Sequence, residues 1–246
     1  MAHEATSSQE ALDRKTLAEA DAATAAAERS RAEAAKFEIE AGLVKAELAS
    51  KALTARALLR QEEAYLASDY FARVYRFEKD INPLTAKACM TLLSEWSRLE
   101  PGCAMEVVFN SPGGSIVDGM ALYDFIQDLR ASGHMITTSC LGMAASMAGI
   151  LLQAGDRRTM GRQSWLMIHE ASFGAGGKTG EVEDRVEWVK RIQERILDIF
   201  AERCLTAGEA ATQRLTRGKI KASWTRKDWW VSSDEALKYG LIDSFR

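Results

Sequence analysis

Ser146 is the first residue whose type and setting could carry out chemistry. It lies in the run LGMAASMAGILLQAG (141–155), a single hydroxyl among small and apolar residues. An apolar helix is expected to start there, which would place the hydroxyl at a helix N-terminus beside free backbone N–H groups. An acyl-transfer nucleophile needs such donors, because the developing oxyanion must be stabilised. A helix-capping serine is the commoner explanation of the same pattern.

Histidine is scarce in this chain, and only one of its three histidines is well placed for catalysis. His169 ends the apolar strand WLMIH, where a side chain would project from the sheet into a cleft. Taken alone, a histidine at a strand end is more often a hydrogen-bonded structural residue. His134 opens a strand and is expected to have an exposed ring, and His3 lies in a terminus expected to be disordered.

A carboxylate that orients the histidine would be the third member of a catalytic set. Asp184 and Asp198 lie off the apolar stripe of a long helix, so solvent exposure explains them. Asp234 belongs to a short helix, and Asp243 to the last segment. Asp228, in RKDWWVS, precedes an aromatic strand and is expected to be partly buried. Geometry alone supports the choice of Asp228 only weakly.

The turn Pro112-Gly113-Gly114 offers a second set of backbone donors. Glycine lets the main chain come close to a substrate. As a bare motif, however, Pro-Gly-Gly indicates a turn and nothing more.

Alternating strands and helices after residue 65 would position these side chains. The sequence predicts an α/β domain with largely parallel strands, in which sites gather where strands end. The expected helix 181–204 has a predicted buried stripe of valines, isoleucines and a phenylalanine, and a glycine-rich, hairpin-like piece, SFGAGGKTG, precedes it. Strands are expected at 72–78, 104–110, 134–141 and 164–170, and further helices at 85–99, at 118–133 and from about 145.

Residues 1–65 form a separate region, an Ala/Glu-rich helical or partly disordered extension, and residues 66–246 form the second domain. From Glu4 to Ala64 there is no proline and one glycine, and Phe37, Val44 and Leu48 fall at helical spacing. The pattern predicts one long amphipathic helix of the kind that forms coiled coils. A solvated helix is favoured over a specific binding element, because large apolar side chains are few at its start.

Composition excludes several classes of function. A net charge of −3 gives no basic field for nucleic acid. The four widely spaced cysteines indicate buried free thiols of a cytoplasmic protein rather than a disulfide frame or a metal site. Neither a secretory signal nor an apolar run long enough to span a membrane is expected. No metal or organic cofactor is required for the chemistry considered above.

The blocks NSPGGSIVDGMALYDFIQ, GMAASMAGILLQAG, WLMIHEAS and DWWVSSDEALKYGLID, with the long helix after the glycine-rich piece, occur in an order that resembles ClpP, the proteolytic subunit of Clp proteases. The resemblance covers about residues 70–246. It implies a ClpP/crotonase-like superhelix of β-β-α units with a long handle helix, and a self-compartmentalising serine endopeptidase. Its substrates would be unfolded polypeptides, cleaved inside two stacked heptameric rings.

Carried over residue by residue, the resemblance gives each candidate a role. Ser146 matches the nucleophile, His169 the general base and Asp228 the orienting carboxylate. Gly114 and Met147 match the backbone donors of the oxyanion hole. The helix 181–204 and the strand SFGAGGKTG before it would be the handle that interlocks two rings and lines the substrate groove.

Two features depart from the family pattern. Glu106 and Val108 stand where aromatic residues commonly form pockets for an AAA+ unfoldase, so the acidic group argues against a standard ATPase partner. The long N-terminal helix replaces a short axial loop and is similar to the leaders of phage-encoded ClpP-related proteins. A phage capsid maturation protease is therefore an alternative function.

Three other rivals follow from the same residues. A crotonase-type acyl-CoA enzyme would not need the Ser–His–Asp set. A protease with a Ser–Lys pair would need a lysine near Ser146, and none lies between Leu99 and Gly177. The third rival is not an enzyme: the chain would be a non-catalytic ClpP-like scaffold subunit.

Overall fold

The computed structural model describes the backbone of residues 2–246 and the side chains of residues 12–246. It divides the chain into two compact units, Met1–Tyr65 and Leu66–Arg246. His3 lies outside the described side chains.

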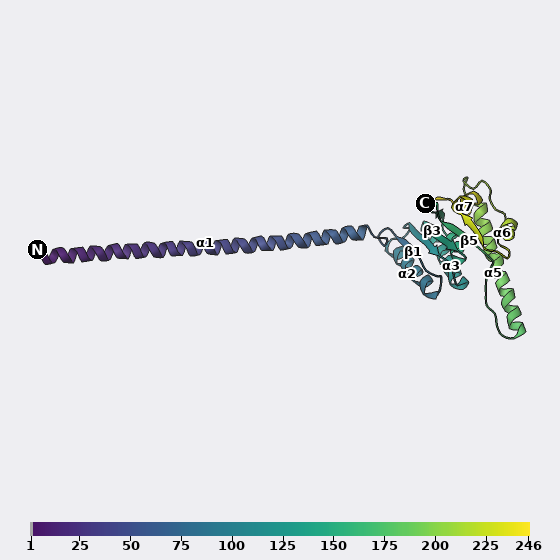
Figure 1. The fold of residues 1–246 in the computed structure, drawn as a ribbon, viewed down its shortest axis with the longest axis horizontal. Helices are drawn as coiled ribbons and strands as arrows, with labels where there is room; N and C mark the ends of the chain where they lie inside the picture. Colours follow the sequence, from purple (N-terminus) through teal and green to yellow (C-terminus); the bar gives the residue numbers. More distant parts are fainter. Residues whose placement is uncertain (1) are drawn as a thin grey trace. The chain divides into compact units, whose positions relative to one another are not determined.

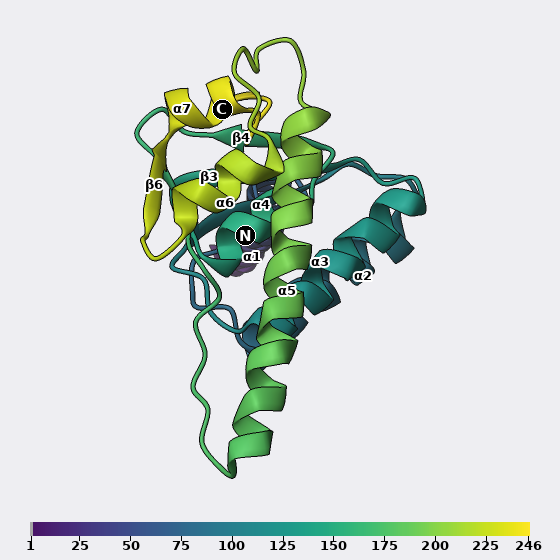
Figure 2. The ribbon, with the colours of Figure 1, turned by 90° about the vertical axis from the view of Figure 1, so that its right-hand side faces the viewer.

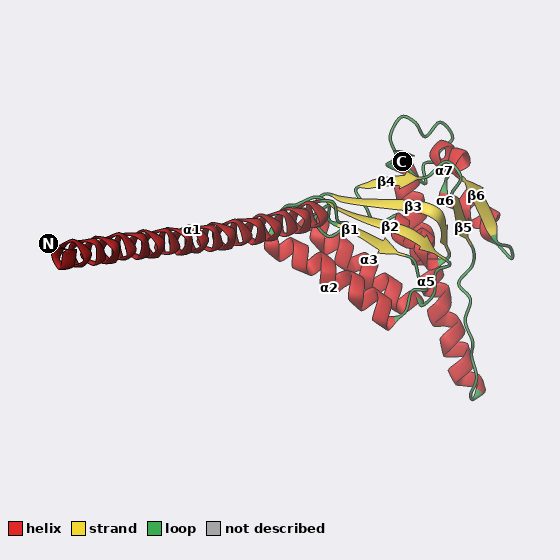
Figure 3. Ribbon diagram, turned by 60° about the vertical axis from the view of Figure 1, so that its left-hand side comes forward, coloured by secondary structure: helices red, strands yellow, loops and turns green. Residues whose placement is uncertain are grey.

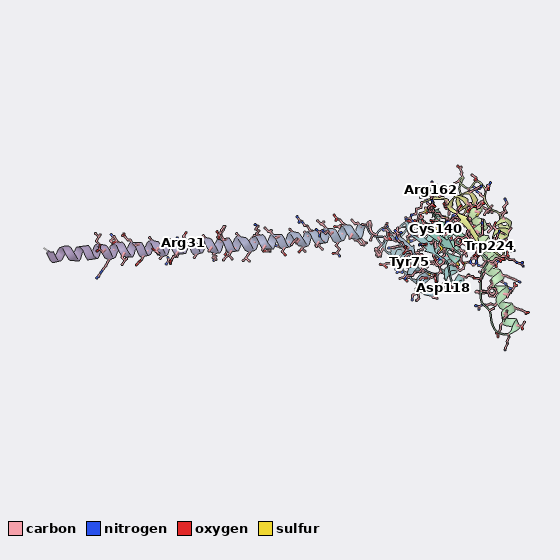
Figure 4. The ribbon with its side chains drawn as sticks, in the orientation of Figure 1. Arg31, Tyr75, Asp118, Cys140, Arg162 and Trp224 are labelled. Carbon is pink, nitrogen blue, oxygen red and sulfur yellow. The ribbon has the colours of Figure 1, made fainter. Side chains whose placement is uncertain are left out.

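The first unit is one continuous helix, α1 (Ala2–Leu66) (Figure 1). Alanine, glutamate, lysine and arginine dominate it and favour this conformation. Ion pairs between neighbouring turns, such as Lys51 Nζ to Glu47 Oε1 at 2.8 Å, add a few tenths of a kcal/mol. The predicted apolar stripe is exposed, as at Phe37 and Leu48, and Leu43 and Leu53 lie outside that stripe. Figure 4 shows side chains, Arg31 among them, projecting from α1 after its first turns.

The second unit is built on a seven-stranded sheet whose path runs β1-β2-β3-β4-β7, with β5 joined to β3 and β6 to β5. All pairs are parallel except β5–β6 (Figure 3). The strands are β1 (Val74–Phe77), β2 (Met105–Ser111), β3 (Ile136–Ala145), β4 (Arg157–Met160), β5 (Trp165–Ile168), β6 (Trp229–Ser232) and β7 (Ser244–Phe245).

Helices pack on this sheet and enclose the core (Figure 2). α2 packs on α3, α3 on α4, and α5 on both α4 and α6. Asn82 caps α2 by accepting the N–H groups of Leu84 and Thr85, and Pro83 occupies the first turn. The helices are α2 (Pro83–Leu99), α3 (Ile116–Ala131), α4 (Met147–Leu152), α5 (Thr179–Leu205), α6 (Arg217–Trp224) and α7 (Ser233–Tyr239).

A buried ion pair ties the last strand to the sheet. The Arg158 side chain is 1% exposed, and its Nη2 lies 2.5 Å from Asp243 Oδ1. The guanidinium also donates to Gln153 Oε1 and to the Gly240 carbonyl. Asp243, whose side chain is 26% exposed, is therefore a structural carboxylate.

Two details of the handle region differ from the sequence-based expectation. The glycine-rich segment 172–178 is an irregular connection and not a strand, because no strand among the described residues pairs with it. Only the C-terminal half of the predicted stripe in α5 is buried, at Val189, Ile196 and Phe200, whereas Val182 and Val186 are half-exposed. The first turns of α5 extend beyond the core that would cover them (Figure 2).

Candidate active site

Ser146 lies at the junction between β3 and α4, in a conformation that few residues adopt. Its φ of 55° and ψ of −123° are sterically unfavourable for a residue with a Cβ atom. The bond from Ser146 N to the Met167 carbonyl, 2.8 Å, fixes this turn against β5. The Ser146 side chain makes no capping hydrogen bond to α4. The commoner explanation of this serine, a helix cap, is therefore wrong.

His169 reaches the Ser146 hydroxyl because β3 and β5 are adjacent parallel strands. Ala145 pairs with Met167, so the residues after these strands emerge at the same edge of the sheet. His169 Nε2 lies 2.7 Å from Ser146 Oγ. In this geometry the ring can accept the hydroxyl proton and leave a nucleophilic alkoxide.

The predicted oxyanion donors are the backbone N–H groups of Gly114 and Met147, and both residues line the same small cavity as Ser146. Among the described residues, neither N–H donates a backbone hydrogen bond in the turns, loops and helix caps. Gly113 is required beside them: a Cβ atom there would lie 2.7 Å from Ser146 Cβ and 2.9 Å from Met147 N. Its neighbour Gly114 is held by Ile81, whose backbone brackets it through bonds to Gly113 O and Ser115 N.

The cavity at this junction has a volume of about 40 Å³ and an apolar wall. Isoleucines and a phenylalanine from α3, α4, β5 and α5 exclude water from the side of the hydroxyl that faces the core. A low local dielectric strengthens any hydrogen bond made to an oxyanion there. The apolar lining consists of Ile116, Ile150, Ile168, Ile196 and Phe200.

Asp228 is brought toward His169 by strand pairing but is not bonded to it. The antiparallel ladder of β5 and β6 ends with Ile168 opposite Trp229, so its next step would set His169 opposite Asp228. Within the described residues no hydrogen bond joins the two side chains, and Asp228 is exposed rather than partly buried. The expected burial is therefore wrong, because the turn before β6 runs over the surface. The orienting role remains a prediction.

His134 is not the exposed residue that its position suggested. It is 4% exposed, and its Nε2 lies 2.8 Å from Ser97 Oγ while its Nδ1 lies 3.1 Å from the Cys103 carbonyl. The ring joins α2 to the connection before β2. His134 is therefore a structural histidine, and the expectation of an exposed ring is wrong.

The cysteines are free and buried, as predicted. Burial raises the pKa of the Cys140 thiol to about 12 and that of Cys204 to about 11. Thiols with such pKa values are neutral and poorly nucleophilic near pH 7. None of the cysteines is suited to replace Ser146 as a nucleophile.

Glu106 and Val108, the two departures from the family pattern, lie in β2 with different surroundings. Val108 is 3% exposed and belongs to the interior. The Glu106 carboxylate accepts hydrogen bonds from Ser139 Oγ and from Arg246 Nη1. The surface above β2 is therefore lined by a charged pair and is not an apolar pocket.

Glu170 is a site residue that the sequence did not single out. It lines the same cavity as Ser146 and His169, and its carboxylate contacts two segments far apart in the chain. In the sequence, only its place directly after a candidate catalytic histidine could have indicated that Glu170 belongs to the site.

In the part of the chain that the structure describes, no group of three or more His, Cys, Asp or Glu side chains could hold a metal ion. Within the same residues, no helix is both long and apolar enough to cross a membrane.

Comparisons with known proteins agree on one family. The family model described as Clp protease matches residues 64–245. A protein named ATP-dependent Clp protease proteolytic subunit from Bacteroides fragilis is 31% identical over 173 residues, covering 70% of this chain and 77% of the relative. The protein of the same name from Deinococcus radiodurans is 33% identical over 145 residues, covering 58% of this chain and 65% of the relative.

Proposed function

Because the chain belongs to the Clp protease family, we propose that it is a serine endopeptidase that hydrolyses peptide bonds of unfolded proteins or peptides. The observation that carries the proposal is the 2.7 Å distance between His169 Nε2 and Ser146 Oγ, with no capping role for that hydroxyl. The two relatives described above are named as proteolytic subunits, which supports the same chemistry.

In the proposed mechanism His169 removes the proton of Ser146 as Oγ attacks a peptide carbonyl. The oxyanion of the tetrahedral intermediate accepts hydrogen bonds from the N–H groups of Gly114 and Met147. His169 then protonates the leaving amine, and water, activated by the same ring, hydrolyses the acyl-enzyme. Asp228 would turn toward Nδ1 and stabilise the imidazolium, a movement of the turn before β6 that substrate or a neighbouring subunit would favour.

We further propose that the active form is a homo-oligomer, in the ring arrangement that the family resemblance implies. The supporting observation is the first half of α5, where Val182 and Val186 are half-exposed and Trp188 is 45% exposed. Exposed apolar surface of this kind is commonly an interface. An ATPase partner is a weaker proposal, because the Glu106–Arg246 pair occupies the surface above β2.

The test is the variant Ser146→Ala, compared with Ser132→Ala, which removes an exposed hydroxyl at the end of α3. Ser146→Ala should lower peptide hydrolysis by about 10⁶-fold, the typical loss for a serine-protease nucleophile, without changing the mass of the assembly. Ser132→Ala should keep the wild-type rate. A fluorophosphonate probe should label wild-type protein and Ser132→Ala only. Hydrolysis by Ser146→Ala at the wild-type rate would contradict the mechanism, and a wild-type protein that is neither labelled nor active would favour a scaffold role.

A further inference from the structure

Glu170, the residue after the candidate general base, is hydrogen-bonded to the segment that carries Asp228. Its Oε2 accepts a hydrogen bond from the backbone N–H of Arg226 at 2.9 Å. Its Oε1 accepts one from Gln193 Nε2 at 3.4 Å, on α5. Three segments therefore meet at one carboxylate: the end of β5, the middle of α5 and the turn between α6 and β6.

The turn that Glu170 holds is conformationally unusual. Arg226 has a φ of 56°, one of three positive values among the described residues other than glycine. A side-chain-bearing residue adopts this region only when its surroundings enforce it. The bond from Arg226 N to Glu170 is one such constraint, and Asp228 follows two residues later. The carboxylate thus sets the point from which the chain enters β6.

The contacts of Glu170 differ from those of an ordinary surface glutamate. Among the described residues it forms no ion pair, and its partners are a backbone N–H and a side-chain amide. Hydrogen bonds from neutral donors to a carboxylate are short-ranged and directional, so they fix geometry more than they supply long-range attraction. These contacts therefore favour a role for Glu170 in positioning its partners over a role as a charge.

We propose that Glu170 is a positioning residue for the catalytic set: it anchors Arg226 at the end of β5, so that the movement that brings Asp228 to His169 Nδ1 is confined to the residues after Arg226. The proposal rests on the proposed serine-peptidase function. Backbone pairing aligns β5 with β6, and the Glu170 side chain separately holds the turn beyond the last pair of residues. Errors of about 1 Å in a catalytic group cost up to about 10²-fold in rate, which makes such a tether consequential.

The experiment compares Glu170→Ala, Glu170→Gln and Glu235→Ala in the full-length chain. Glu235 is the matched control, because its Oε2 also accepts a backbone N–H, that of Ser232, at 2.9 Å, at the opposite end of β6. Glu170→Ala should lower kcat and the rate of fluorophosphonate labelling of Ser146 by about 10–100-fold, with KM little changed. Glu170→Gln keeps an oxygen that can accept the Arg226 N–H and should restore most of the rate. Glu235→Ala should react like wild type.

A double-mutant cycle with Asp228→Ala tests whether Glu170 acts through Asp228. Groups that act as one unit are not additive, so Glu170→Ala should cost little further rate once Asp228 is gone. Equal losses in both backgrounds, or a Glu170→Gln variant as slow as Glu170→Ala, would overturn the proposal. Labelling of Ser146 separates this result from the test of the proposed function. If the wild-type protein is labelled but cuts no peptide, the labelling rates of the variants still test the role of Glu170. If the wild-type protein is not labelled, both the peptidase function and the role of Glu170 are refuted.

Discussion

The N-terminal helix and the Clp-family domain contain the same kinds of residues in opposite environments. Leu48 in α1 is 61% exposed, whereas Leu93 in α2 is fully buried. The ion pair Lys51–Glu47 in α1 has side chains 71% and 66% exposed, whereas in the Arg158–Asp243 pair of the domain they are 1% and 26% exposed. Helical spacing and charge pairing are alike in both regions. The comparison shows that apolar spacing and ion pairs contribute substantially to the free energy of unfolding only where other parts of the fold bury them.

The largest expected contrast concerns the ion pairs. Asp243→Asn leaves the Arg158 guanidinium buried without its charge partner, which should lower the free energy of unfolding by about 3–5 kcal/mol. The matched variant in α1, Glu47→Gln, should change it by less than about 0.5 kcal/mol, because exposed pairs contribute little. Urea unfolding followed by circular dichroism measures both, and equal effects would remove the contrast between the regions.

The Asp243 pair also makes a prediction about acid. Burial by itself would raise the pKa of Asp243, but hydrogen bonds and charge from Arg158 outweigh it and hold the pKa below its ordinary value. The pair therefore stabilises the fold above the unfolded-state pKa of about 4, and this contribution is lost as the pH falls through the lower folded-state pKa. Unfolding measured between about pH 6 and about pH 3 should show a steeper loss in wild type than in Asp243→Asn.

The second contrast concerns leucines in helices. Leu93→Ala leaves a cavity in the core and should cost about 2–5 kcal/mol of unfolding free energy. Leu48→Ala in α1 should stay within about 0.5 kcal/mol, since its side chain is already exposed. A large loss for Leu48→Ala in the assembled protein would show that α1 is covered by another copy or by a partner.

The smallest effect is expected from removing α1 altogether. The unit Leu66–Arg246 has its own core and contains every residue of the candidate site. A variant that begins at residue 66 should therefore keep the wild-type Tm, Ser146 labelling rate and peptide hydrolysis. Native mass measurement compares its assembly with that of the full chain. Loss of assembly on truncation would make α1 an association element.

Sequence reasoning located Ser146, His169 and the glycine turn because each follows a strong apolar strand, and strand ends define sites in parallel sheets. It failed for His134 because the partners that bury the ring, Ser97 and Cys103, are more than thirty residues away. The short strand β4 was missed since RRTM has little apolar periodicity, and its place depends on the distant Asp243. Glu170 was missed for the same reason: its partners are set by tertiary structure.

The antiparallel pairing of β5 with β6 determines which residues of the two strands lie opposite each other. Directly opposed residues point to the same face of a sheet, and a shift of one residue moves every side chain of the strand to the other face. Deleting a single residue between Trp229 and Ser232 would leave both strands able to pair, yet it would change which residue faces His169. A change of two residues would keep the side chains of β6 on their original faces, yet it too would move Asp228 from the position opposite His169. The candidate site therefore depends on the exact length of one short strand.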